Sequence, residues 1–168
     1  DGGFGLMETM DAGDYAAFRP NLSGGSGFQS AQFREVELAL GCARPETLQQ
    51  KAFTELERQR LAARQASPSL WDSFVALLGA RGYGAEEGAL RAAYQEQDLR
   101  TVIEELTALD NTLLQWRFHH AAMAERAIGN AVGTGGAGVE YLYKSAKTRA
   151  FPALMAMRAG LHKPLVEE

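Results

Sequence analysis

Residues 98–127 carry the sequence DLRTVIEELTALDNTLLQWRFHHAAMAERA, the longest stretch of the chain with a single clear periodicity. Side chains of one stripe recur there at steps of three and four residues, which places them on one side of an α-helix. The members of this stripe are Leu99, Val102, Leu106, Leu109, Leu113, Trp116, His120, Ala124 and Ala127. The pattern predicts one long amphipathic helix with His120, rather than His119, in line with its buried face.

The rest of the chain has helical periodicity as well, and no stretch alternates in the manner of a β-strand. We expect helix starts at the cap Asp11, at the capping-box pair Ser26 and Gln29, and at the pair Ser67-Pro68. The expected helices cover residues 11–20, 26–41, 45–61, 67–78, 98–127, 139–147 and 151–161, with glycine-rich turns at 79–88 and 129–138. The prediction is an all-α fold, with a single helical domain over 1–162 and a tail over 163–168.

Composition narrows the possible partners. With 46% apolar residues the chain can build a core, and the net charge of −4, from 17 Lys and Arg against 21 Asp and Glu, disfavours nucleic acid. No apolar run is long enough to cross a bilayer, so we expect no membrane partner. Cys42 is the only cysteine, which excludes an internal disulfide and a cysteine metal site and favours a reducing, cytoplasmic setting. Because residue 1 is Asp, we expect a trimmed chain, a processed chain or part of a larger protein.

His120 is the first candidate for chemistry. A buried imidazole next to a glycine-rich loop can bind a metal, but His119 and His162 do not complete a convincing multi-histidine zinc site. A haem iron needs only one proximal protein ligand, so a solitary inward histidine is compatible with haem. Periodicity alone favours the alternative, in which His120 is a core histidine bonded to a carbonyl.

Tyr15 and Arg19 are one helical turn apart and project from one face. A guanidinium can grip a carboxylate with two hydrogen bonds, and a tyrosine hydroxyl can add a third donor, so this pair could bind an amino acid. The alternative is a structural ion pair or a surface arginine. Thr134, in the loop Gly133-Thr134-Gly135-Gly136, can offer its hydroxyl to a charged substrate group, or the loop is a linker.

Other charged and aromatic positions are given structural interpretations. We expect Arg34, Glu35 and Glu37 to form a solvated helix face, and the charges between residues 55 and 64 to do the same. Trp71 and Trp116 are expected to be core residues.

With these motifs in view, the chain resembles the tryptophan 2,3-dioxygenase family from Glu8 to Leu161. The resemblance rests on the blocks Glu8-Thr9-Met10, Tyr15-Ala16-Ala17-Phe18-Arg19, Ser26-Gly27-Phe28-Gln29-Ser30, Gln32-Phe33-Arg34, Trp116-Arg117-Phe118 with His120, Arg126 with Ile128-Gly129, Gly133-Thr134-Gly135-Gly136, Gly138-Val139, Tyr141-Leu142 and Phe151-Pro152. The family is all-helical and depends on haem, and its members are homotetramers.

The resemblance implies a role for each matched residue. His120 would be the proximal ligand of haem b, and Ser26 and Gly27 would line the distal haem pocket. Arg19 would bind the substrate carboxylate, supported by Tyr15, and Thr134 would contact the amino-acid end. The implied reaction adds both atoms of O₂ across the indole C2–C3 bond of L-tryptophan to give N-formylkynurenine, in a homo-oligomer (tetramer or dimer).

Three departures from the family pattern keep other activities open. The family's N-terminal helices have no counterpart, so no catalytic residue is expected in this chain and the distal His would lie in the missing part. The glycine loop is one residue short, His119 replaces the usual Arg, and the stretch from Ser30 to Trp116 is shorter than usual. The alternatives are a haem-dependent aromatic hydroxylase acting on tryptophan, tyrosine or an analogue, and a non-catalytic haem-binding helical protein.

Overall fold

The computed structural model describes residues 11–18, 31–48, 53–129, 131 and 138–162. Its helices are α2 (Ala12–Phe18), α3 (Ala31–Leu40), α4 (Pro45–Leu48), α5 (Glu55–Gln65), α6 (Leu70–Ala80), α7 (Glu87–Ala93), α8 (Gln97–Ile128), α9 (Val139–Ala146) and α10 (Pro152–Gly160). The described part of the chain contains no strand, so the all-α prediction is confirmed.

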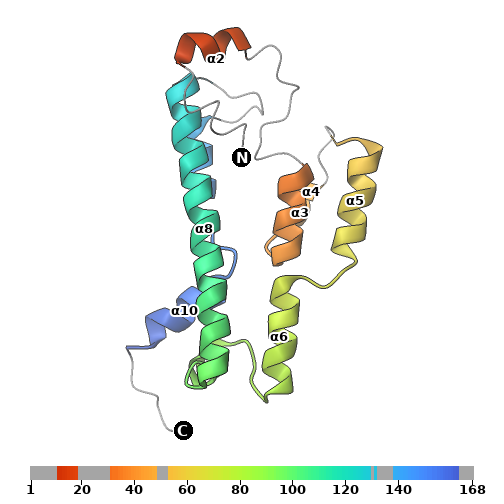
Figure 1. Ribbon diagram of the computed structural model, residues 1–168, viewed down its shortest axis with the longest axis vertical. Coiled ribbons are helices and arrows are strands. Elements are labelled where there is room, and N and C mark those ends of the chain that lie inside the picture. Colours follow the sequence, from red (N-terminus) through yellow and green to blue (C-terminus); the bar gives the residue numbers. More distant parts are fainter. Residues whose placement is uncertain (1–10, 19–30, 49–52, 130, 132–137, 163–168) are drawn as a thin grey trace.

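The long predicted helix is present as α8, one unbroken helix of 32 residues. At a rise of 1.5 Å per residue its axis is about 48 Å long. Figure 1 shows α8 running along the molecule, with α2 across one of its ends and with α3 and α6 following each other in a second column beside it. The helix ends at Gly129, whose φ of 55° lies in the region that favours glycine.

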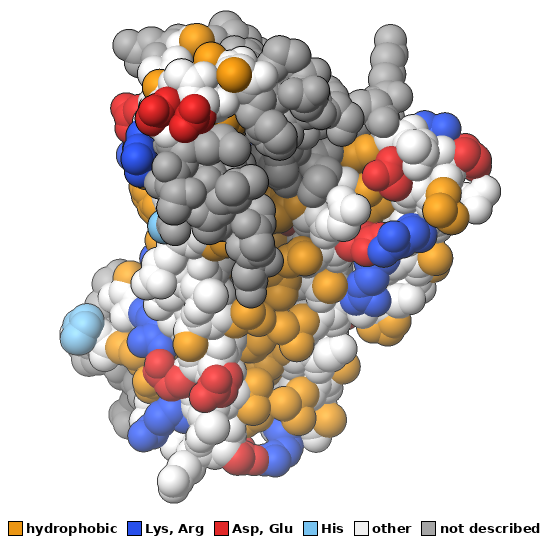
Figure 2. All heavy atoms as spheres, turned by 45° about the horizontal axis from the view of Figure 1, so that its top comes forward, with side chains coloured by type: hydrophobic (Ala, Val, Ile, Leu, Met, Phe, Trp, Pro, Cys, Tyr) orange, Lys and Arg blue, Asp and Glu red, His pale blue; other side chains and the backbone are white. Residues whose placement is uncertain are grey.

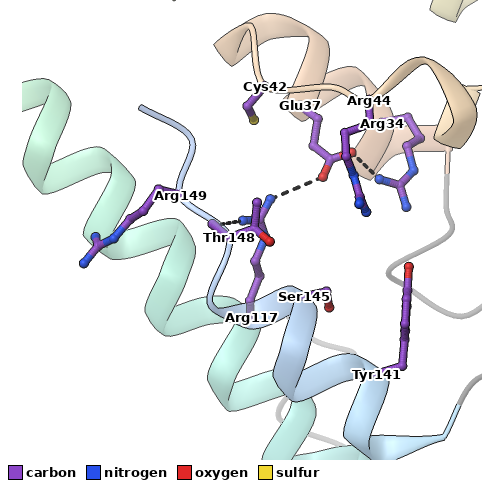
Figure 3. A pocket seen from close by; sticks show the side chains of 9 residues that line it. All are labelled: Arg34, Glu37, Cys42, Arg44, Arg117, Tyr141, Ser145, Thr148 and Arg149. Atoms are coloured by element: carbon purple, nitrogen blue, oxygen red, sulfur yellow. Dashed lines mark hydrogen bonds and ion pairs between the residues drawn. The ribbon is translucent and has the colours of Figure 1, made fainter. Parts of the chain in front are cut away.

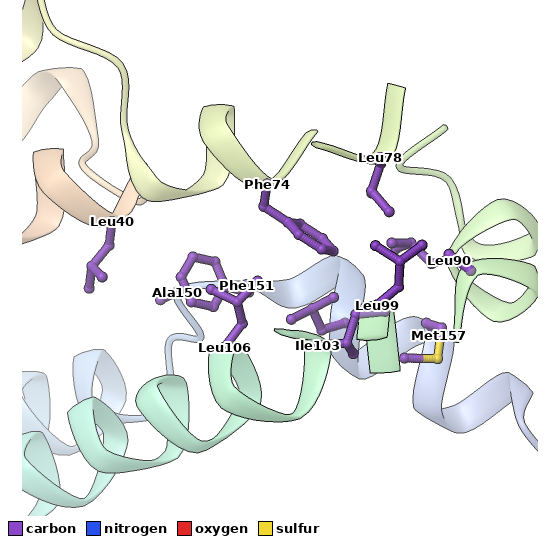
Figure 4. Close-up of a cluster of buried hydrophobic side chains, with 12 residues drawn as sticks. Leu40, Phe74, Leu78, Leu90, Leu99, Ile103, Leu106, Ala150, Phe151 and Met157 are labelled. Atoms are coloured by element: carbon purple, nitrogen blue, oxygen red, sulfur yellow. The ribbon is translucent and has the colours of Figure 1, made fainter. Parts of the chain in front are cut away.

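The main hydrophobic core lies around the N-terminal half of α8. Leu99 and Ile103 from α8 meet Phe74 and Leu78 from α6, and α7 and α10 close the cluster from the other sides (Figure 4). The largest apolar side chains in it are almost completely buried, with Leu78 and Ile103 at 0% exposure. Because this half of α8 is packed on several sides, the core holds the helix that carries His120 in its other half.

The helix caps confirm part of the sequence prediction. The Asp11 carboxylate accepts a hydrogen bond from the backbone N–H of Asp14 at 2.8 Å, as expected of an N-cap. Gly41 ends α3 with a φ of +87°, and α9 and α10 lie where the last two helices were predicted. The predicted start at Ser26 lies outside the described residues, which resume at Ala31, the first residue of α3 as the structure describes it.

Two helix predictions were wrong in their bounds, and one helix was not predicted. The helix expected over 45–61 ends as α4 at Leu48, and α5 starts separately because Thr54 and Glu57 form a capping box. The cap of α6 is Ser69, paired with Asp72, and not Ser67. Helix α7 occupies a stretch in which the sequence indicated none.

Exposed apolar side chains mark one face of the molecule. Figure 2 shows hydrophobic side chains gathered in a strip along the middle of that view. Leu109, which was predicted to lie on the buried stripe of α8, is 39% exposed, so that prediction was wrong. The buried face of α8 runs instead through Ile103, Asp110, Arg117 and Ala121, each of which follows a member of the predicted stripe by one residue.

Candidate functional site

His120 lies on α8 with its imidazole half-buried, whereas the neighbouring His119 is exposed. This confirms the prediction that His120 is the inward member of the pair. Burial lowers the pKa of His120 below its ordinary value of 6.5, because the charged imidazolium loses contact with water. The side chain is therefore neutral at pH 7, which is the form that can bind a metal ion.

An aromatic column holds the His120 ring. Trp116, four residues earlier on the same face of α8, stacks on His120 with ring centres 5.8 Å apart and an interplanar angle of 18°. Phe33 of α3 stacks in turn on Trp116, with ring centres 5.1 Å apart and an interplanar angle of 21°. The column joins two helices that are far apart in sequence, and it places an aromatic surface against the candidate ligand.

A buried charge cluster lies beside this column. The Glu37 carboxylate pairs with the Arg34 guanidinium on its own helix and, at 3.2 Å, with the Arg117 guanidinium of α8. Arg117 also donates to the carbonyl oxygen of Thr148. Arg34, Glu37 and Arg117 are only 6%, 8% and 4% exposed, so the prediction of a solvated face was wrong for Arg34 and Glu37. Glu35 does lie nearer the surface, where it pairs with Arg60 at 2.9 Å.

The same charged residues line a small polar hollow that is open to solvent (Figure 3). Its described lining consists of Arg34, Glu37, Cys42, Arg44, Arg117, Tyr141, Ser145, Thr148 and Arg149. Arg34, Arg44 and Arg117 outnumber Glu37 among these residues, so the described lining carries more positive than negative groups. In Figure 3 Tyr141 and Ser145 rise from α9 toward the side chains of α3, whereas Arg149 points away. Its guanidinium donates to the side-chain oxygen of Asn111 at 2.6 Å.

Cys42 lies at the edge of this hollow and is half-buried. Burial, followed by the nearby carboxylate of Glu37, raises the pKa of its thiol to about 11. A thiol with this pKa is almost entirely protonated at neutral pH. Cys42 is therefore not an activated nucleophile.

The substrate-side residues are only partly described. Tyr15 is half-buried on α2, and α2 contacts α8, the helix that carries His120. Arg19, Ser26, Gly27 and Thr134 lie outside the described residues, so their predicted roles stay predictions. The structure places the helix of Tyr15 against that of His120.

Sequence reasoning missed Phe33, Glu37 and Arg117 as contributors to this region. The spacing of Arg34 and Glu37, three residues apart on one helix, was the available signal for an ion pair. The link from Glu37 to Arg117 joins positions 80 residues apart, which no local pattern reveals.

The donor set fits haem better than a metal ion held by several protein ligands. No group of three or more His, Cys, Asp or Glu side chains that could hold a metal ion occurs in the described ranges. One neutral, half-buried histidine on a long helix is the set that a proximal haem ligand requires. In the described part of the chain, no helix is both long enough and apolar enough to pass through a bilayer.

Fold and donor set thus define a helical protein with one inward histidine suited to haem. The family model of tryptophan 2,3-dioxygenase matches residues 2–78 and 81–161. The chain belongs to the tryptophan 2,3-dioxygenase family, a family of haem dioxygenases.

Individual relatives are similar over most of this chain. It is 36% identical over 167 residues to a tryptophan 2,3-dioxygenase of Nocardioides sp., a match that covers 93% of this chain and 62% of the relative. It is 39% identical over 176 residues to a tryptophan 2,3-dioxygenase of Herpetosiphon aurantiacus, and this match covers 93% of the present chain and 67% of the relative. For the Burkholderia pseudomallei enzyme, the identity is 36% over 179 residues and 58% of the relative is covered. The chain spans between 58% and 67% of the length of these relatives.

Proposed function

We propose that this chain is the haem-binding portion of a dioxygenase that converts L-tryptophan and O₂ into N-formylkynurenine. The observation that carries the proposal is His120, a neutral and half-buried imidazole on α8 in a chain of this family. In the proposed reaction both oxygen atoms add across the indole C2–C3 bond, which breaks as the ring opens.

The chain's own residues would bind and orient the reactants. His120 would hold the iron through one ring nitrogen, and Ser26 and Gly27 would line the distal side of the pocket. Arg19 would grip the substrate carboxylate with Tyr15 in support, and Thr134 would contact the amino-acid end. Haem b, when bound, would supply the activation of O₂. The residues of this chain would thus contribute by fixing the indole edge rather than by proton transfer.

Several features of the active protein belong to this proposal as well. No catalytic acid or base is assigned to this chain, and a distal histidine is expected from a part of the protein that precedes the matched region. We also propose that the protein is a homo-oligomer, either a tetramer or a dimer, and that it works in the cytoplasm.

The first test asks whether His120 binds the iron. The full chain is loaded with haem, and the absorption spectra of the His120→Ala and His119→Ala variants are compared with the unmodified protein. We expect the Soret band to shift or vanish only for His120→Ala, because His119 is exposed. An unchanged Soret band in His120→Ala would remove His120 as the ligand.

The second test counts oxygen atoms. The reduced protein with haem reacts with L-tryptophan under ¹⁸O₂, and the product mass is measured. Two incorporated ¹⁸O atoms support the dioxygenase. One ¹⁸O atom indicates an aromatic hydroxylase instead, and the absence of product from a fully haem-loaded and complete protein indicates a non-catalytic haem-binding protein.

A further inference from the structure

The ring of His120 is the end of a three-ring column that starts on another helix. The column runs from Phe33 of α3 through Trp116 to His120, with centre distances of 5.1 Å and 5.8 Å and interplanar angles of 21° and 18°. The plane of Trp116 is therefore tilted by only about 20° from the plane of each of its two neighbours. Because Trp116 and His120 belong to the same helix, Phe33 is the member of the column that comes from outside α8.

Phe33 is firmly held. Its side chain is 7% exposed, and the guanidinium carbons of Arg34 and Arg117 lie 5.4 Å and 5.6 Å from its ring centre. The Glu37 carboxylate joins those two arginines, so α3 and α8 are tied together beside the column. Breaking a buried pair of this kind leaves an uncompensated charge, which makes the junction resistant to sliding.

An imidazole that binds iron needs a defined ring plane. The torsion that turns a histidine ring about its Cβ–Cγ bond has broad minima, so the ring needs neighbours to fix it. Residues that orient a metal ligand tune the metal as well as its binding strength. Here the large flat neighbour of His120 is Trp116, and Phe33 packs on Trp116.

We propose that Phe33 is a positioning residue for His120 and acts through Trp116, so that α3 sets the plane of the candidate iron ligand. The inference rests on the proposed function, since it matters only where His120 binds haem. It assigns a role in the haem site to a residue that would not touch the haem iron, the substrate or the reacting atoms.

The test uses the full chain loaded with haem and reduced, and it measures the iron–imidazole stretching band by resonance Raman spectroscopy. We expect Phe33→Leu to keep the Soret band of the unmodified protein while its iron–imidazole band shifts and broadens. Phe33→Tyr keeps a ring at this position and should restore the original band. Phe74→Leu is the matched control, because Phe74 is 3% exposed and contacts Trp71 in the main core. It should lower stability without moving the band.

The route through Trp116 gives a second criterion. Trp116→Leu should shift the band, and adding Phe33→Leu to it should cause no further shift. An unchanged band in Phe33→Leu with an intact Soret band would overturn the inference, and so would a double variant that shifts more than Trp116→Leu alone. If Phe33→Leu does not fold, Phe33→Met decides by the same criteria, because Met fills the space without a ring plane. Failure of the proposed function itself is detected separately, because an unchanged Soret band in His120→Ala would show that His120 does not bind the iron.

Discussion

Replacement of Glu37 by glutamine should destabilise the protein far more than a typical surface substitution. The Glu37 carboxylate pairs with both the Arg34 and the Arg117 guanidiniums, and the side chains of Glu37, Arg34 and Arg117 are 10%, 7% and 5% exposed. Glu37→Gln keeps the shape but removes the negative charge, which leaves two buried guanidiniums without their shared carboxylate. Removing one partner of a buried ion pair costs about 3–5 kcal/mol. We expect a loss of unfolding free energy in that range.

The assay is urea unfolding of the full chain followed by circular dichroism at 222 nm. With a slope of about 2 kcal/mol per molar urea, the midpoint should fall by about 2 M. Glu35→Gln is the matched control, on the same helix and with the same chemical change. Its partner Arg60 is 56% exposed, so the control should lose at most about 1 kcal/mol.

A double-mutant cycle separates charge from packing. If Glu37→Gln destabilises the protein by leaving charge uncompensated, the double variant with Arg117→Gln should lose less unfolding free energy than the sum of the losses of the two single variants. A Glu37→Gln variant as stable as the Glu35→Gln control would refute the reasoning, because the cluster would then contribute no more than a surface pair.

Three further predictions follow from local contacts. With its pKa raised to about 11, the Cys42 thiol has a thiolate fraction at pH 8 about 100-fold smaller than that of a thiol of pKa 9.0, so it should react more slowly with iodoacetamide. The rate should still rise about tenfold per pH unit at pH 10, and a plateau by pH 9.5 would contradict this. Ser69→Ala should cost about 1 kcal/mol in urea unfolding because it removes the cap of α6, whereas Ser67→Ala should change little; equal losses would show that the cap is misassigned. Gly41→Ala should be destabilising by more than about 1 kcal/mol, because φ of Gly41 is +87° and a Cβ atom there would come within 2.6 Å of the Ser69 hydroxyl. Gly79→Ala, in the open part of α6, should be neutral or stabilising, and thermal unfolding measures both effects.

The long helix was predictable because its periodicity repeats over about eight turns, so that single exceptions do not change the result. Shorter elements were less predictable for a physical reason. The run after Pro45 has helical spacing throughout, but Thr54 and Glu57 satisfy the first N–H groups of a new helix there, and this local capping starts α5 afresh. Both serines before α6 are cap residues by type, and only the hydrogen bonds to Asp72 distinguish Ser69 from Ser67.

The candidate site was likewise predictable from the sequence only in part. The inward orientation of His120 follows from its place on the helix, which sequence alone provides. The burial of Glu37 does not, because a charged residue type predicts solvent and only its pairing with Arg117, 80 residues away, makes burial tolerable. The column from Phe33 likewise depends on how two helices meet.

The unbroken course of α8 has a consequence for how the protein opens. Its first half lies within the main hydrophobic cluster at Leu99, Ile103 and Leu106, whereas its second half packs outside that cluster. Native-state hydrogen exchange should therefore show amides of the first half opening only with the whole domain and amides beyond Ala121 opening in smaller steps. Such a gradient would let the end of α8 that carries His120 unfold locally and refold around a bound group while the first half of the helix stays folded.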